Sequence, residues 1–163
     1  MLDWVKLAEV SDGLGLSRDP TIERTLAWIE MVRAKESTWA WAILWNDDYV
    51  GNVVFDQIDR RAKTARFSVY LGDPNARSRG VGTTAIYRAL AKVFFDEHLH
   101  KVWLTVHAEN AAAKKVYTNL GFQVEGTLRE AFVLGNRRLD ALYMGLLADE
   151  FATLETEDIG LNG

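Results

Sequence analysis

Residues Arg77–Thr83 (RSRGVGT) follow an apolar run and precede a long amphipathic segment. This order predicts a turn from a strand into a helix, whose N-terminus carries free backbone N–H groups and partial positive charge. Gly80 and Gly82 allow a phosphate to approach the backbone closely and allow positive φ angles. Arg77 and Arg79 can add charge-assisted hydrogen bonds to the same anion. The stretch therefore suits a phosphate group, and a plain turn with solvated arginines is the alternative.

Two further polar residues, Asn110 and Tyr117, lie about 30 residues downstream. They are seven residues apart, which is two turns of a helix, so both project from one side of it. Each also has a purely structural interpretation, Asn110 as the N-cap of the helix and Tyr117 as a core residue with a satisfied hydroxyl. For Trp103 and His107, packing on a sheet face is the structural alternative to a catalytic role.

Hydrophobic periodicity predicts the elements that position these groups. We expect strands over 39–45, 49–55, 64–71, 102–107, 123–134 and 139–147, and helices over 3–10, 20–35, 82–99 and 111–120. A loop is expected over 11–18, a hairpin turn over 46–48, and a frayed helix or coil in the acidic tail over 149–163. The result is one α/β domain over 1–163 with a mostly antiparallel sheet covered on both faces.

The composition is typical of a single globular domain. The chain has 163 residues, of which 48% are hydrophobic and 26% charged, and it has no cysteine, which excludes disulfides, thiol nucleophiles and cysteine-ligated zinc. The net charge of −4 argues against nucleic acid as a partner, and three histidines without ligand spacing predict no metal site. Without a signal pattern or an apolar run long enough to span a bilayer, we expect a cytoplasmic protein with no membrane contact.

The combined order of strand, glycine turn, long helix, strand, asparagine and short helix resembles the GNAT superfamily of N-acetyltransferases, over roughly residues 20–150. The residues that carry this resemblance are Arg77, Gly80, Gly82, Asn110, Tyr117, Gly121 and Phe122. Glu125–Arg129 together with Asp140 is similar to the branch of ribosomal-protein alanine N-acetyltransferases and related small-amine acetyltransferases. The resemblance implies a single-domain fold with a mixed sheet, helices on both faces and a splayed strand pair that binds acyl-coenzyme A.

The resemblance also implies which residues contact acetyl-CoA, the expected cosubstrate. Its pyrophosphate would bind at the glycine turn, and its amide-bearing arm would lie between residues 69–71 and 104–107. The expected contact residues are Val69, Leu71, Arg77, Ser78, Arg79, Gly80, Val81, Gly82, Thr83, Asn110, Ala113 and Tyr117.

Direct attack of an amine on the thioester requires a donor for the departing thiolate and a base for the amine. Tyr117 is the candidate donor; a phenol of ordinary pKa facing a thiol makes full proton transfer uphill by roughly 2 kcal/mol, so a hydrogen bond is the first role we assign. Many relatives carry a glutamate on the strand before the phosphate turn, where this chain has Arg66. Asp56, His107 and Glu109 remain as candidate bases, with no order among them.

The acceptor is left open as a primary amine, either a protein N-terminal α-amine or a small molecule. A non-catalytic acyl-CoA binder or sensor with the same fold is the principal alternative, and Arg66 is the residue that favours it. A nucleotide-binding P-loop is a weaker alternative, because Arg77–Thr83 lacks the Lys-Ser/Thr ending that contacts phosphate and Mg²⁺. We expect a monomer or a homodimer.

Overall fold

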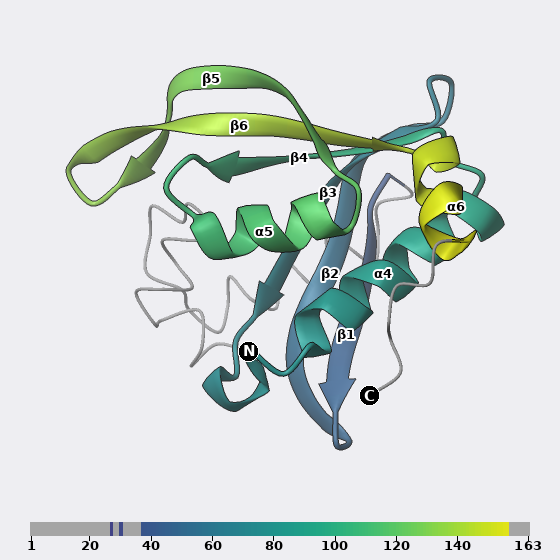
Figure 1. Cartoon of the computed structure of the whole chain (residues 1–163). Coiled ribbons are helices and arrows are strands. Elements are labelled where there is room, and N and C mark those ends of the chain that lie inside the picture. The colour runs from purple at the N-terminus through teal and green to yellow at the C-terminus, as the bar shows by residue number, and fades with distance from the viewer. Residues whose placement is uncertain (1–26, 28–29, 31–36, 157–163) are drawn as a thin grey trace.

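Two apolar strands form an antiparallel hairpin at one edge of the sheet (Figure 1). The structure, a computed structural model, describes residues 37–156 together with Ala27 and Glu30. Strands β1 (Trp39–Trp45) and β2 (Asp48–Asp59) are joined by Asn46 and Asp47, with φ angles of 51° and 65°. A two-residue loop with both residues at positive φ matches the right-handed twist of the strands it connects. The predicted hairpin is confirmed, and β2 is longer than expected.

The sheet has six strands in the order β1-β2-β3-β4-β6-β5. The remaining strands are β3 (Thr64–Leu71), β4 (Lys101–His107), β5 (Gln123–Leu134) and β6 (Arg137–Leu147). Every neighbouring pair is antiparallel except β3 and β4, which are parallel. The prediction of a mostly antiparallel mixed sheet is therefore confirmed, with strand bounds close to those expected.

A long helix follows the glycine turn, as predicted. Helix α4 (Val81–Ala91) continues into a π-helical turn, η2 (Lys92–Asp96), and its core-facing residues Ile86, Leu90, Val93 and Phe94 are buried. The helix ends three residues before the predicted Leu99, and His98 adopts a positive φ of 56°. A short 3₁₀ turn, η1 (Pro74–Ala76), precedes the glycine turn, and helix α5 (Ala111–Asn119) follows β4.

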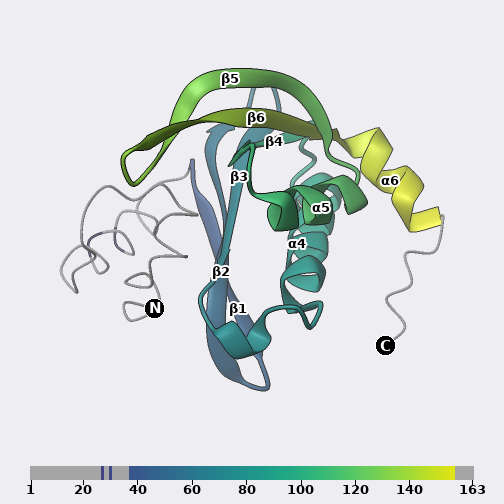
Figure 2. The ribbon, with the colours of Figure 1, turned by 60° about the vertical axis from the view of Figure 1, so that its left-hand side comes forward.

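Helices α4 and α5 lie on the same side of strands β1–β3 (Figure 2). The helix expected over 3–10 and the loop expected over 11–18 lie outside the described residues, as does the helix expected over 20–35 apart from Ala27 and Glu30, which are helical. No helix in the described part of the chain is long and apolar enough to cross a membrane.

Of the two alternatives expected for the C-terminal tail, a frayed helix or coil, the structure shows a helix over residues 149–156, docked onto the core. These residues belong to helix α6 (Ala148–Thr156), which follows β6 directly. Phe151 is 0% exposed, and its ring centroid lies 5.3 Å from those of Tyr87 and Phe94. Phe151 docks α6 against α4 and η2. In the sequence it is one aromatic residue among acidic neighbours, a pattern that predicts burial only weakly. Residues 157–163 lie outside the description.

Candidate active site

The parallel strands β3 and β4 separate after three paired positions. Thr64, Ala65 and Arg66 pair with residues 101–103, and no pairing continues beyond them. Figure 1 shows the two strands running apart toward their C-terminal ends. The backbone groups along 67–71 and 104–107 that face this opening are not bonded across it, so they are available to a ligand. The gap predicted between 69–71 and 104–107 is present.

A cleft of about 550 Å³ occupies this opening. Ten of the twelve predicted contact residues line it: Val69, Leu71, Arg77, Ser78, Gly80, Gly82, Thr83, Asn110, Ala113 and Tyr117. Sequence reasoning missed several other lining residues, among them Ile86, Val116 and Phe132. Phe132 comes from the β5–β6 hairpin, and no local sequence signal indicates that this strand returns to the mouth of the cleft.

The glycine turn forms one end of the cleft. Gly80 is the N-cap of α4 in the left-handed region, at φ 77°, where a side chain would be strained. Gly82 does not have a positive φ, and an added Cβ would lie 3.9 Å from Leu71 Cδ2, an ordinary contact. The expectation of positive φ therefore holds for Gly80 and is wrong for Gly82. Ser78 also adopts the left-handed conformation, at φ 57°. The sequence of the turn did not predict this conformation for a serine.

The two arginines of the turn point to different places. Arg77 lines the cleft. Arg79 donates from Nε to the Asn75 carbonyl oxygen at 2.9 Å, and its guanidinium carbon lies 5.5 Å from the Trp45 ring centroid. Arg79 and Val81 line a separate groove instead of the cleft.

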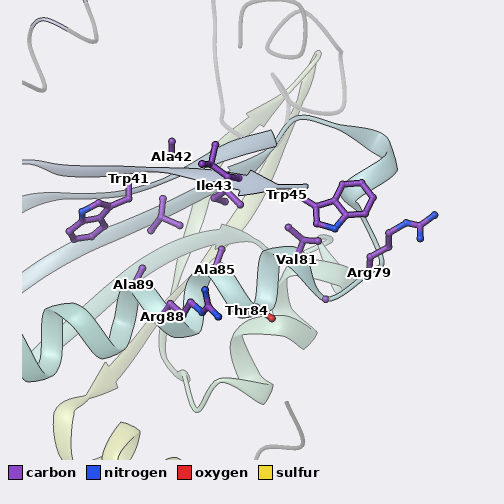
Figure 3. Close-up of a pocket in the computed structure, with 13 residues that line it drawn as sticks. Trp41, Ala42, Ile43, Trp45, Arg79, Val81, Thr84, Ala85, Arg88 and Ala89 are labelled. Atoms are coloured by element: carbon purple, nitrogen blue, oxygen red, sulfur yellow. The ribbon is translucent and has the colours of Figure 1, made fainter. Parts of the chain in front are cut away.

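That groove, about 430 Å³, lies between β1 and α4. Figure 3 shows Trp41 and Ile43 facing Ala85 and Ala89 across it, with Arg79 beside Trp45 at one end. Its described lining is apolar apart from Thr84, two arginines and backbone atoms, and it includes no carboxylate, histidine or tyrosine. The groove therefore offers no acid–base chemistry.

Helix α5 presents Asn110 and Tyr117 to the cleft, as their spacing predicted. Asn110 is the N-cap, and its Oδ1 accepts a hydrogen bond from the Ala113 amide at 3.0 Å. With Oδ1 used in the cap, the Nδ2 amide of Asn110 remains as a donor to a ligand. The left-handed Gly121, at φ 88°, follows the helix where the sequence predicted its end.

Tyr117 is held in an aromatic wall. Its ring is edge-on to Phe67 at 6.2 Å and to Phe122 at 5.8 Å between centroids. Burial raises the pKa of Tyr117 to about 12. Proton transfer from this phenol to a thiolate of ordinary pKa is then uphill by about 5 kcal/mol, more than twice the value for an unburied phenol. The hydroxyl can donate a hydrogen bond, and full proton transfer is strongly disfavoured.

Two candidate bases are ion-paired and do not line the cleft. Asp56 accepts two hydrogen bonds from Arg66, at 2.7 Å from Nε and 2.6 Å from Nη2. This bidentate pair joins neighbouring positions of β2 and β3. Glu109 lies 2.6 Å from Nη2 of Arg137 in an exposed pair. Each carboxylate is already engaged by a guanidinium, and neither lies in the lining of the cleft.

The third candidate, His107, lines the cleft. Its ring lies 4.9 Å from that of Phe132 between centroids. Its Nδ1 atom is buried and, among the described residues, has no hydrogen-bond partner. Leaving a buried polar atom unpaired costs about 1–3 kcal/mol, so such atoms mark places where a ligand or water belongs.

The cleft reaches both faces of the sheet. Val69 and Leu71 share the face of the buried Phe67, whereas Tyr70 lies on the opposite face. On β4, Thr105 and His107 likewise alternate with the buried Leu104 and Val106. The Tyr70 hydroxyl lies 2.7 Å from that of Tyr49, and burial raises the pKa of Tyr70. One ligand can therefore enter along α4 and α5 while a second approaches from the face of Tyr70 and His107.

Comparison with known families agrees with this architecture. Residues 2–123 match the family described as "Acetyltransferase (GNAT) domain". The chain belongs to the GNAT acetyltransferase family.

Among curated relatives, the chain is 32% identical over 102 residues to the spermidine N(1)-acetyltransferase of Vibrio cholerae, covering 63% of this chain and 58% of the relative. It is 31% identical over 99 residues to an L-amino acid N-acetyltransferase of Escherichia coli, covering 60% of each. The chain thus spans about three fifths of the length of these relatives.

A crystal structure of the Vibrio cholerae spermidine N-acetyltransferase, in complex with CoA and spermine, has the same fold. The TM-score is 0.86 at 22% identity, with 93% of this chain and 89% of that chain covered.

Proposed function

We propose that this protein is an acetyl-CoA-dependent N-acetyltransferase that acts on primary amines. The observation that carries the proposal is the cleft between the splayed strands β3 and β4. It has a turn suited to an anion at one end, a partly buried tyrosine in its lining and access from both faces of the sheet. Membership of the GNAT family and relatives named as spermidine and amino acid N-acetyltransferases support it.

Several features of the cleft fit coenzyme A. The first-turn N–H groups of α4, with Gly80 as the N-cap, suit its pyrophosphate, and Arg77 adds positive charge. Among the described strands, none pairs with the sides of Val69–Leu71 and residues 104–107 that face the opening. These backbone groups suit the amides of the arm, which can take the place of a neighbouring strand. Tyr117 would then lie beside the sulfur.

The reaction is a direct transfer. The neutral amine attacks the thioester carbonyl carbon, a C–N bond forms and the C–S bond breaks. Backbone N–H groups near Leu71 polarise the carbonyl oxygen, where negative charge develops. The Tyr117 hydroxyl donates a hydrogen bond to the departing sulfur, since its raised pKa disfavours complete proton transfer.

The amine acceptor is either a small molecule or the α-amine of a polypeptide. The curated relatives favour a small amine. Four further points stay predictions. They are closeness to the ribosomal-protein branch, a cytoplasmic location, a monomeric or homodimeric state, and a single domain over 1–163.

A non-catalytic acyl-CoA binder remains the second candidate, because the bidentate Arg66–Asp56 pair takes up the strand position at which an acidic base is expected. Calorimetry with acetyl-CoA and a thiol-release assay with a panel of amines and N-terminal peptides separate the two. Acceptor-dependent release of free thiol supports the enzyme. Tight binding without turnover on any acceptor supports the sensor, and no binding contradicts both.

A further inference from the structure

His107 stands apart from the other titratable residues near the β3–β4 opening. It lines the cleft, and it carries a buried nitrogen, Nδ1, that no described residue satisfies. Its ring is held against Phe132, which fixes the imidazole beside the mouth of the cleft. A buried polar atom without a protein partner, in a ring that borders a ligand cleft, is placed to contact what enters it.

The other candidates for accepting a proton are less suited. Asp56 is held by two hydrogen bonds from Arg66, and Glu109 is paired with Arg137. The phenols in the cleft remain protonated near neutral pH because burial raises the pKa of both Tyr70 and Tyr117. Among the described lining residues, an imidazole is then the remaining side chain that can accept a proton.

We propose that His107 is the catalytic base that deprotonates the acceptor ammonium, an inference that rests on the proposed acetyltransferase function. The imidazole takes one proton from the ammonium and later releases it to solvent. The neutral nitrogen forms a bond with the acetyl carbon, and the C–S bond breaks. The second amine proton passes to the thiolate, with the Tyr117 hydroxyl bonded to the sulfur, so that the products are an amide, the free thiol and one proton.

The cost of deprotonation depends on the class of acceptor. Reference imidazole lies about 1.5 pKa units below an α-amine and about 4 units below an alkyl amine. Proton transfer to imidazole is therefore roughly 400-fold more favourable from an α-ammonium than from an alkylammonium. An amine of low pKa, such as that of an amino acid or a peptide N-terminus, is therefore the acceptor that His107 deprotonates at the lowest cost.

Other charged or titratable groups surround His107 and will influence its pH dependence. Tyr70 on β3, Tyr117 on α5 and Arg77 in the turn share the cleft with it. Around the end of β4, Lys114 donates from Nζ to the Ala108 carbonyl oxygen, the Asp140 carbonyl oxygen accepts from the Ala108 amide, and Glu109 is paired with Arg137.

The test compares His107→Gln with His100→Gln, a matched change at an exposed histidine outside the cleft. For His107→Gln we expect kcat/KM to fall by about 10²- to 10⁴-fold, the usual contribution of a general base. We also expect loss of the acidic limb of the pH profile and an acetyl-CoA Kd within twofold of the parent. Added imidazole should restore part of the activity of His107→Ala. His100→Gln should match the parent protein.

Three results distinguish the possibilities. If the parent protein binds no acetyl-CoA or transfers no acetyl group, the proposed function fails, and the role of His107 fails with it. If the parent is active but His107→Gln keeps its kcat/KM and pH profile, only the assignment of His107 is overturned, and Asp56→Asn and Glu109→Gln then identify the alternative base. If the parent prefers spermidine over α-amines at pH 7, the acceptor class is overturned; these two parent measurements need no variant to fold.

Discussion

The glycine turn separates two hollows that differ in what they can do. The cleft between β3 and β4 collects Tyr70, His107, Asn110 and Tyr117 from β3, β4 and α5. The groove between β1 and α4 is walled by apolar side chains, with arginines as its charged residues. Gly80 borders both. The cleft can support chemistry because several elements bring polar side chains to backbone groups that face its opening. The groove is of similar size, but it lies between one strand and one helix and is only a packing feature.

The largest effect that separates the two hollows should come from Tyr117→Phe. The ring contacts with Phe67 and Phe122 are kept, and the hydrogen bond to the departing sulfur is lost. We expect kcat to fall about 100-fold, the scale of one removed transition-state hydrogen bond, with little change in acetyl-CoA affinity. Tyr143→Phe, outside the cleft, is the control. An unchanged kcat would remove Tyr117 from the mechanism.

A smaller effect is expected at the turn itself. Gly80→Val forces a β-branched residue to φ 77° in open space, so its cost lies in the backbone and should shift the turn. We expect acetyl-CoA Kd, measured by calorimetry, to weaken about tenfold.

Gly135→Val is the matched control for this change. Gly135 also has a positive φ, 59°, with nothing within 4 Å of an added Cβ, but it lies in the β5–β6 turn. Both variants should lose similar stability in thermal unfolding. Equal losses of acetyl-CoA affinity would show that the effect at Gly80 is not local to the cleft.

The two arginines of the turn allow the cleft and the groove to be compared directly, because each lines one of them. Arg77→Gln should weaken acetyl-CoA binding about fivefold at low salt, because a partly solvated charge-assisted bond is lost. Arg79→Gln should stay within twofold of the parent protein, since this side chain bonds Asn75 and lies over Trp45. The reverse order in calorimetry would place the anion on the groove side of the turn.

The smallest expected effect concerns kcat at alkaline pH, where ionisation of Tyr117 should cause no fall. Because burial raises the pKa of Tyr117 to about 12, its donor form persists below that value and is lost as the pH rises through it. The kcat of the parent should therefore show no fall due to this phenol below about pH 10.5. A falling limb near pH 10 that disappears in Tyr117→Phe would contradict the buried environment of the hydroxyl.

Much of the fold follows from short-range patterns in the sequence. Alternating or continuous apolar runs predicted all six strands, and the stripe through Ile86 and Phe94 predicted the buried side of α4. The sequence left α6 open between a frayed helix and coil, because Phe151 is the one fully buried side chain among its described residues, and the partners Tyr87 and Phe94 come from distant positions. A lone aromatic residue in an acidic stretch has no periodicity to indicate burial.

The candidate site was predictable only in part. The turn over 77–83 and the spacing of Asn110 and Tyr117 are local features, and ten of twelve expected residues line one cleft. The candidate bases could not be ranked, because ion pairing depends on which strands are neighbours. Only the register of β2 with β3 brings Arg66 onto Asp56, and only the fold leaves Nδ1 of His107 buried without a protein partner.

The sequence by itself determined the approximate bounds of the six strands and of helices α4 and α5, the cap at Asn110 and the glycine needed at position 80, because each depends mainly on contacts within a few residues. Tertiary structure alone decided which arginine faces the cleft, which acids are neutralised and how far burial raises the pKa of Tyr117. Those properties are set by groups brought together from distant parts of the chain, whose distances no local pattern encodes.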